Sequence, residues 1–75
     1  MTKQIDIKEL IPKMKPGYVA CDEDGSWYWY SDTPERIDKM RAWISCLGIC
    51  ECLSNIFDIA PAKDWTKSLI KVGEK

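Results

Sequence analysis

The strongest constraint on the fold is a β-hairpin pattern in residues 17–31. Two β-rich runs flank Asp24-Gly25, the dipeptide that a type I′ turn prefers. A turn closed at this dipeptide pairs Cys21 with Tyr28, Ala20 with Trp29, and Val19 with Tyr30. The sequence therefore predicts an antiparallel hairpin as the basis of the fold.

Successive side chains of a strand alternate between the two faces of a sheet. In this predicted hairpin, the residues on both faces are apolar or aromatic. One face carries Val19, Cys21, Tyr28 and Tyr30. The other face carries Tyr18, Ala20, Trp27 and Trp29. One face must belong to the core, and the second is either covered or open to a partner. If the second face is open, the predicted partner-binding residues are Tyr18, Trp27 and Trp29, with a charged rim of Asp22, Glu23 and Asp24. The choice of core face stays open.

Short helical segments are predicted near both ends of the chain. Asp6 is suited to cap a helix with Glu9 at its third position, and Pro12 ends that helix. Asp64 is suited to cap one helical turn in the same way. Residues 69–72 then form an edge strand.

Residues 33–48 fit two structures. Their apolar spacing, between a threonine-proline start and a glycine end, favours an amphipathic helix. The alternative is a pair of strands over residues 41–46 and 49–53, which would place Trp43 opposite Cys52. Periodicity alone favours the helix, but the strand pair stays open as the alternative.

These elements predict an α+β fold: a small antiparallel sheet, built on the hairpin 17–31 and extended by strands in 41–53, with short N- and C-terminal helices. The chain has 75 residues, which is enough for one small domain spanning residues 1–75. Its apolar content of 45% and charged content of 31% are typical of a folded domain.

Several functional classes are disfavoured. The chain has no histidine, so a Ser-His-Asp or Cys-His catalytic pair is absent, and we expect no enzyme. Its net charge of -1 lacks the positive field of a duplex nucleic-acid binder. No secretory signal and no run approaching about 18 apolar residues is found, which predicts a soluble, cytoplasmic protein without a membrane contact.

The cysteines raise the question of a metal site. Cys46, Cys50 and Cys52, with Cys21 as a fourth ligand, could form a small structural zinc module. Structural zinc sites usually pair their ligands in CxxC-like knuckles, which this spacing lacks. In a reducing cytoplasm we expect free thiols that pack as small apolar side chains, and no metal or cofactor.

Three segments carry a resemblance to other proteins. Residues 9–20 (ELIPKMKPGYVA), 22–30 (DEDGSWYWY) and 57–73 (FDIAPAKDWTKSLIKVG) resemble a group of small, uncharacterised proteins from bacteriophages, prophages and gut bacteria. Members of that group have an extended stretch leading into a Trp-x-Ser segment, which Trp43-Ile44-Ser45 matches, and this favours strands in residues 41–53. The resemblance implies a mobile-element origin and supplies no mechanism, because no known activity attaches to the group.

The aromatic residues give the functional hypothesis. Tryptophan and tyrosine dominate the energetics of protein interfaces, so we expect a non-catalytic module that binds a protein partner, self-association included. The alternative is that the row Trp27 to Tyr30 stacks on the bases of single-stranded nucleic acid. The acidic residues beside this row would repel phosphate, which makes nucleic acid the weaker hypothesis.

Overall fold

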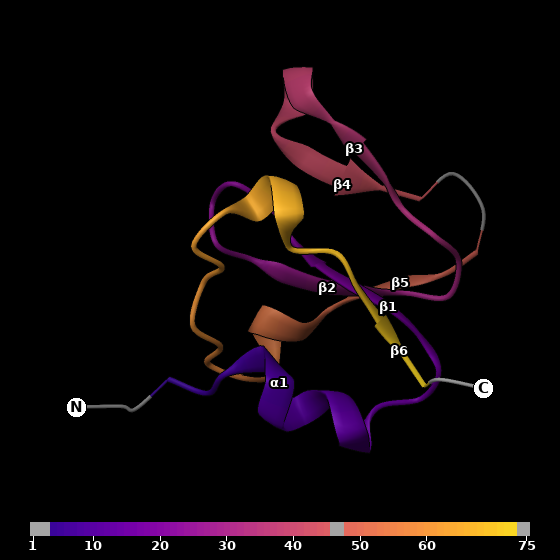
Figure 1. Cartoon of the computed structure of the whole chain (residues 1–75), viewed down its shortest axis with the longest axis vertical. Helices are drawn as coiled ribbons and strands as arrows, with labels where there is room; N and C mark the ends of the chain where they lie inside the picture. The colour runs from indigo at the N-terminus through magenta and orange to yellow at the C-terminus, as the bar shows by residue number, and fades with distance from the viewer. Residues whose placement is uncertain (1–3, 46–47, 74–75) are drawn as a thin grey trace.

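A computed structural model describes residues 4–45 and 48–73 of the chain (Figure 1). These residues form a four-stranded sheet in the order β5-β2-β1-β6 and a two-stranded sheet of β3 and β4. The four-stranded sheet contains β1 (Gly17–Cys21), β2 (Trp27–Tyr30), β5 (Cys50–Cys52) and β6 (Ile70–Val72). The second sheet contains β3 (Glu35–Ile37) and β4 (Ala42–Ile44), and all these strand pairs are antiparallel. With the helix α1 (Ile7–Leu10), the structure confirms a small α+β fold.

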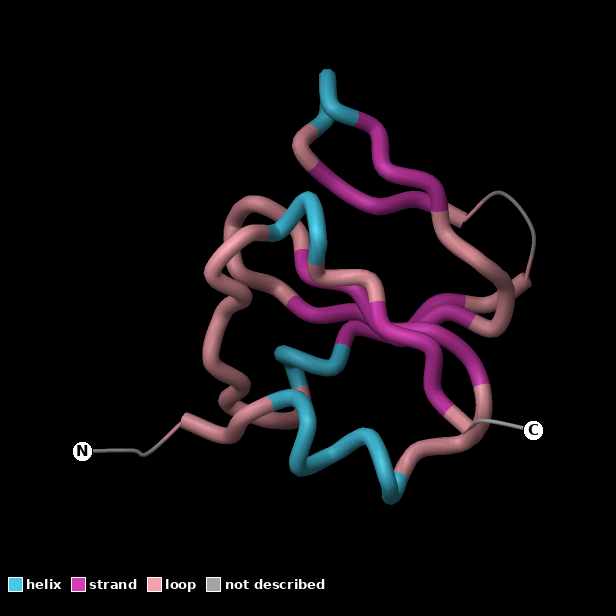
Figure 2. Tube along the Cα trace, in the orientation of Figure 1, coloured by secondary structure: helices cyan, strands magenta, loops and turns pink. Residues whose placement is uncertain are grey.

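The chain is arranged in layers around the four-stranded sheet. Helix α1 and the 3-10 helices Ile11–Lys13 and Leu53–Asn55 lie on one side of this sheet (Figures 1 and 2). The β3–β4 hairpin stands on the other side, with a 3-10 helix over Asp38–Met40 at its tip (Figure 2). The core and the candidate site described below therefore lie on opposite faces of one sheet.

The predicted hairpin is present, but its predicted register is wrong by one residue. Cys21 pairs with Trp27 and Val19 pairs with Trp29. The reason is the loop: Asp22 N–H donates to the Ser26 carbonyl at 2.9 Å, which leaves three residues in the turn where a type I′ turn has two. Gly25, the last of the three, has a φ of 93°, a conformation that glycine adopts without strain.

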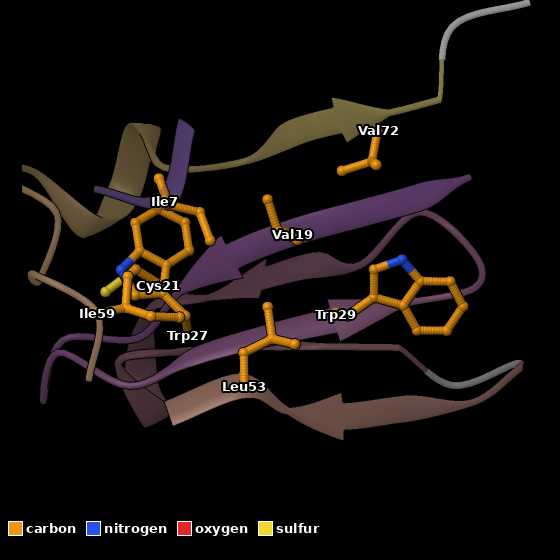
Figure 3. Close-up of a cluster of buried hydrophobic side chains, with 8 residues drawn as sticks. All are labelled: Ile7, Val19, Cys21, Trp27, Trp29, Leu53, Ile59 and Val72. Carbon is orange, nitrogen blue, oxygen red and sulfur yellow. The ribbon is translucent and has the colours of Figure 1, made fainter. Parts of the chain in front are cut away.

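This shift regroups the side chains, because moving one strand by one residue turns its side chains to the opposite face. Trp27 and Trp29 lie on the same face as Val19 and Cys21 and are 2% and 6% exposed. The buried core cluster, drawn in Figure 3, contains Ile7, Val19, Cys21, Trp27, Trp29, Leu53, Ile59 and Val72. The predicted faces are therefore wrong: Tyr28 and Tyr30 exchange places with the two tryptophans, and Trp27 and Trp29 form no exposed surface.

The structure decides between the alternatives for residues 33–53 in favour of strands. The helix is wrong, and β3, β4 and β5 occupy the described part of this segment. The predicted pairing of Trp43 with Cys52 is also wrong, since Trp43 lies opposite Arg36 and Cys52 lies opposite Tyr28. The chain closes β3 and β4 into a local hairpin, with Arg41 in the left-handed conformation at φ 53°. This local pairing leaves β5 free to extend the main sheet.

Both predicted helix caps are confirmed. The Asp6 carboxylate accepts a hydrogen bond from Lys8 N–H at 2.9 Å and begins α1, which passes into the 3-10 helix Ile11–Lys13 at the predicted end. The Asp64 carboxylate accepts a hydrogen bond from Thr66 N–H at 3.1 Å and begins the 3-10 helix Trp65–Lys67. The predicted edge strand is β6, which pairs with β1.

Candidate functional site

A groove lies between the second face of the main sheet and the β3–β4 hairpin. It has a volume of about 280 Å³. Its walls come from the end of β1, from β2, from β4 and its flank, and from β5. The lining residues are Asp22, Tyr28, Tyr30, Ala42, Trp43, Ile44, Ser45 and Cys50. We call this feature the aromatic–acidic groove.

Hydrogen bonds fix the two walls of this groove against each other. The Tyr30 hydroxyl donates to the Trp43 carbonyl at 3.0 Å, and Trp43 N–H donates to Asp22 Oδ1 at 3.0 Å. The Trp43 indole Nε1–H donates to the Trp65 carbonyl at 3.0 Å. The backbone and the ring of Trp43 are thus held by three partners far away in the sequence, so the groove is preorganised.

The tyrosines of β2 form the aromatic part of the groove. Tyr30 is 3% exposed and lies at the base, whereas Tyr28 is half-buried. The two ring centroids are 6.3 Å apart with an interplanar angle of 34°. Burial raises the pKa of both phenols, so both are neutral near pH 7.

Asp22 is the acidic group of the groove. Burial raises the pKa of its carboxyl, and the hydrogen bond from Trp43 N–H opposes that rise. The negative charge of Asp24 nearby raises the pKa further. A carboxylate that has lost part of its hydration gains more from a cation than a fully solvated carboxylate does. The groove is therefore suited to a positively charged group.

The other predicted rim residues have structural partners. The Glu23 carboxylate forms an ion pair with Arg41 at 3.3 Å, and Glu23 N–H donates to the Arg41 carbonyl at 3.1 Å. The Asp24 carboxylate accepts a hydrogen bond from Ser26 N–H at 2.9 Å inside the turn. Glu23 thus joins the β1–β2 turn to the second sheet, and Asp24 stabilises the turn itself. Neither residue lines the groove.

Trp27 and Trp29, predicted as partner-binding residues, are structural. The Trp27 indole Nε1–H donates to the Ala60 carbonyl at 2.9 Å, and that of Trp29 donates to the Lys15 carbonyl at 3.2 Å. The Lys15 ammonium also lies 4.8 Å from the Trp29 ring centroid. Tyr18 is half-buried and lies on the same face as Tyr28 and Tyr30, outside the groove lining.

Of the predicted site residues, the structure thus places Asp22 in the groove. The sequence reasoning missed Tyr28, Tyr30 and Trp43, because the register was wrong and because the position of Trp43 depends on distant contacts. One signal could have found the tyrosines: Glu23, Asp24 and Gly25 fit a three-residue loop whose last residue is left-handed.

The cysteines do not gather as the zinc hypothesis requires. Cys21 lies in the core, and burial raises the pKa of its thiol. Cys50 and Cys52 lie on β5, directly across from Tyr30 and Tyr28. They therefore share the face of these tyrosines, which is the face opposite to that of Cys21. Cys21 is therefore no fourth ligand, and residues 4–45 and 48–73 contain no cluster of three metal-ligating side chains. Cys46 lies outside the described residues. Cys50 is exposed, so the expectation of buried cysteines is wrong for this residue.

Comparisons with known proteins give no indication of function, so the functional inference rests on the groove. No protein family matches the chain, and no curated protein or solved structure is similar to it. No helix in the described part of the chain has the length and apolar character needed to cross a membrane.

Proposed function

We propose that this chain is a small, non-catalytic accessory protein, of the mobile-element type that its sequence segments resemble, and that it binds a basic segment of a protein partner. The observation that carries the proposal is the half-buried Asp22 carboxylate beside the rings of Tyr28, Tyr30 and Trp43 in one groove. A lysine or arginine side chain of the partner would enter this groove.

The chemistry of the groove favours a cation that also has an apolar part. Aromatic rings attract cations through their negative faces, by about 0.5–2 kcal/mol per contact depending on desolvation. The Asp22 carboxylate adds a direct ion pair whose strength rises with its partial burial. Arginine fits best, because its planar guanidinium both stacks on rings and donates several hydrogen bonds.

A protein partner is favoured over nucleic acid by the same groove. Its ionised group at neutral pH is a carboxylate, which repels phosphate. Trp27 and Trp29, two of the four rings in the row expected to stack on bases, are buried in the core. The raised pKa values of Tyr28 and Tyr30 also make them poor proton-transfer groups near pH 7, in keeping with a non-catalytic role.

The proposal can be tested by NMR titration of the whole chain with a short glycine peptide that carries one central arginine. We expect shifts of the Asp22 and Tyr28 amides and of the Trp43 indole N–H. The same peptide with citrulline, which lacks the charge, should bind about three- to tenfold more weakly. Equal binding of the two peptides, or no binding of either, would contradict the proposal.

Matched variants locate the binding to the groove. Asp22→Asn keeps an oxygen that can accept from Trp43 N–H but removes the charge. It should weaken binding of the arginine peptide about three- to tenfold. Glu35→Gln makes the same change of charge at an exposed residue of β3 outside the groove, and should have little effect. Equal losses in both variants would indicate a general charge effect instead of a site.

A further inference from the structure

A second cavity lies where the start of α1, residues 60–64 and the segment leading into β6 meet. It has a volume of about 490 Å³, within the usual range for sites of small molecules. Its lining is Asp6, Ile7, Lys8, Trp27, Ala60, Pro61, Ala62, Lys63, Asp64, Lys67, Ser68 and Ile70. We call it the lysine pocket. It shares no lining residue with the aromatic–acidic groove.

The inner part of the lysine pocket is apolar. Figure 3 shows Ile7 and Trp27 close together at one end of the core, and both are buried. Ala62 and Ile70 pack against the same core and are partly exposed. The Trp27 indole N–H already donates to the Ala60 carbonyl, so it requires no partner from a ligand. A ligand therefore meets a mostly apolar floor.

The lining of the lysine pocket includes three exposed lysines from three segments of the chain: Lys8 of α1, Lys63 of the loop, and Lys67 of the last 3-10 helix. Within residues 4–45 and 48–73, no ion pair is recorded for any of these three lysines. All three lysines are exposed, and the Lys67 ammonium contributes to lowering the pKa of the Asp64 carboxyl. Their ammonium groups can therefore attract a ligand anion, with Asp64 sharing the charge of Lys67.

The two carboxylates of the lysine pocket are engaged with the backbone. Asp6 Oδ1 accepts from Lys8 N–H, and Asp64 Oδ1 accepts from the N–H and the hydroxyl of Thr66. Each carboxylate holds the first turn of its own helix. With three lysines against two carboxylates, the lining keeps a positive charge.

We propose that the lysine pocket binds a small organic anion, with a compact apolar body on the floor and a carboxylate or phosphate group among Lys8, Lys63 and Lys67. Charge and apolar surface are both required, because the lysines alone would hold an inorganic anion only weakly in water. This site is independent of the binding of a basic segment in the aromatic–acidic groove.

Three naphthalene probes test this inference in NMR titrations of the whole chain: naphthoate, naphthyl phosphate and naphthylmethylammonium. The two anions should shift the Lys8 and Ser68 amides and the Trp27 indole N–H, and the cation should bind at least about tenfold more weakly. Naphthoate carries a carboxylate and naphthyl phosphate carries a phosphate group. The probe that binds with the lower Kd identifies which of these two groups the pocket prefers. Equal binding of the cation, shifts located elsewhere, or no binding of either anion at about 10 mM would overturn the inference.

Lysine variants test the same point without changing the ligand. Lys63→Gln and Lys67→Gln should each raise the Kd for the preferred anion about three- to fivefold. Lys39→Gln removes the same charge from an exposed residue of the β3–β4 hairpin and should change the Kd less than about twofold. Equal effects of all three variants would show that general charge attraction, and no pocket, holds the anion.

Discussion

Alternate residues of β2 lie on opposite faces of the sheet and have different roles. Trp27 and Trp29 fill the core, while Tyr28 and Tyr30 face the hairpin of the second sheet. Tyr28 is half-buried, whereas its sequence neighbours Trp27 and Trp29 are buried. Tyr28 therefore contributes less to the stability of the core than the two tryptophans do. Substitutions along this one strand separate the two roles.

Trp27→Ala should destabilise the fold strongly. It removes a side chain that is 2% exposed and leaves a cavity in the core, which typically costs about 3–5 kcal/mol. Urea unfolding, followed by circular dichroism, measures the loss. Tyr28→Ala is the comparison on the neighbouring residue and should cost clearly less, because Tyr28 is half-buried. A smaller loss in Trp27→Ala than in Tyr28→Ala would contradict the observed register.

The stability of the fold should carry a pH dependence from Asp22. Its folded pKa is raised above the unfolded value of 3.8, mainly by burial, so the native state binds this proton more tightly than the unfolded state does. The contribution of Asp22 is therefore fully present below pH 3.8 and is lost as the pH rises through the folded pKa. Asp22→Asn, which cannot ionise, should be more stable relative to wild type at about pH 7 than at about pH 3.

Urea midpoints of both proteins at the two pH values measure this difference. Glu35→Gln removes a carboxyl group from an exposed residue outside the groove and is the control for the loss of one acidic side chain. A relative stability of Asp22→Asn that rises toward low pH would show that the Asp22 carboxylate is favourably paired in the native state, contrary to the direction given by its burial.

At the scale of elements, the parts predicted correctly from sequence are those controlled by neighbouring residues. Asp6 and Asp64 cap their helices because the side chain and the backbone N–H that it accepts from lie two residues apart. The hairpin also forms where the pattern places it. Its register depended on whether the loop holds two or three residues, and the Asp24-Gly25 dipeptide fits both loop lengths.

The remaining elements depend on contacts between distant parts of the chain. Trp43 takes its position from Asp22, Tyr30 and Trp65, and no local pattern contains those partners. The apolar spacing of residues 33–48 fits a helix, but these tertiary contacts favour strands, as happens when packing outweighs local preference. The groove lies between these elements, so most of the candidate site could not be predicted from the sequence.

The three-residue loop can be tested at Gly25. Its φ of 93° is unfavourable for a residue with a Cβ atom, and an added Cβ would lie 3.2 Å from the Pro61 side chain. Gly25→Ala should lower the free energy of unfolding by about 1 kcal/mol or more. Gly25→Asn adds the same Cβ but tolerates positive φ better, so it should cost less. Urea unfolding of both variants would show the difference, and equal losses would assign the cost to Pro61 alone.

At the scale of the whole molecule, the two sheets differ in how they are held. The two-stranded sheet stands apart from the helix α1, on the other side of the four-stranded sheet (Figure 1). None of its residues belongs to the buried core cluster, and hydrogen bonds of Tyr30 and Asp22 with Trp43 attach it to the main sheet. Segments with few buried apolar contacts open more readily than a core does. The second sheet should therefore open independently, and with it the outer wall of the aromatic–acidic groove.

Tyr30→Phe tests this independence, because it removes the hydroxyl that donates to the Trp43 carbonyl and keeps the ring. A lost hydrogen bond of about 1 kcal/mol should speed amide hydrogen exchange in β3 and β4 about fivefold. Exchange in β1 and β6 should stay close to wild type, because their pairing and the core beneath them are unchanged. Tyr18→Phe removes a hydroxyl with no recorded hydrogen bond in the described residues, and should leave both sheets unaffected. Equal acceleration of all strands in Tyr30→Phe would mean that the two sheets open as one cooperative unit, and the groove could then open only when the whole fold does.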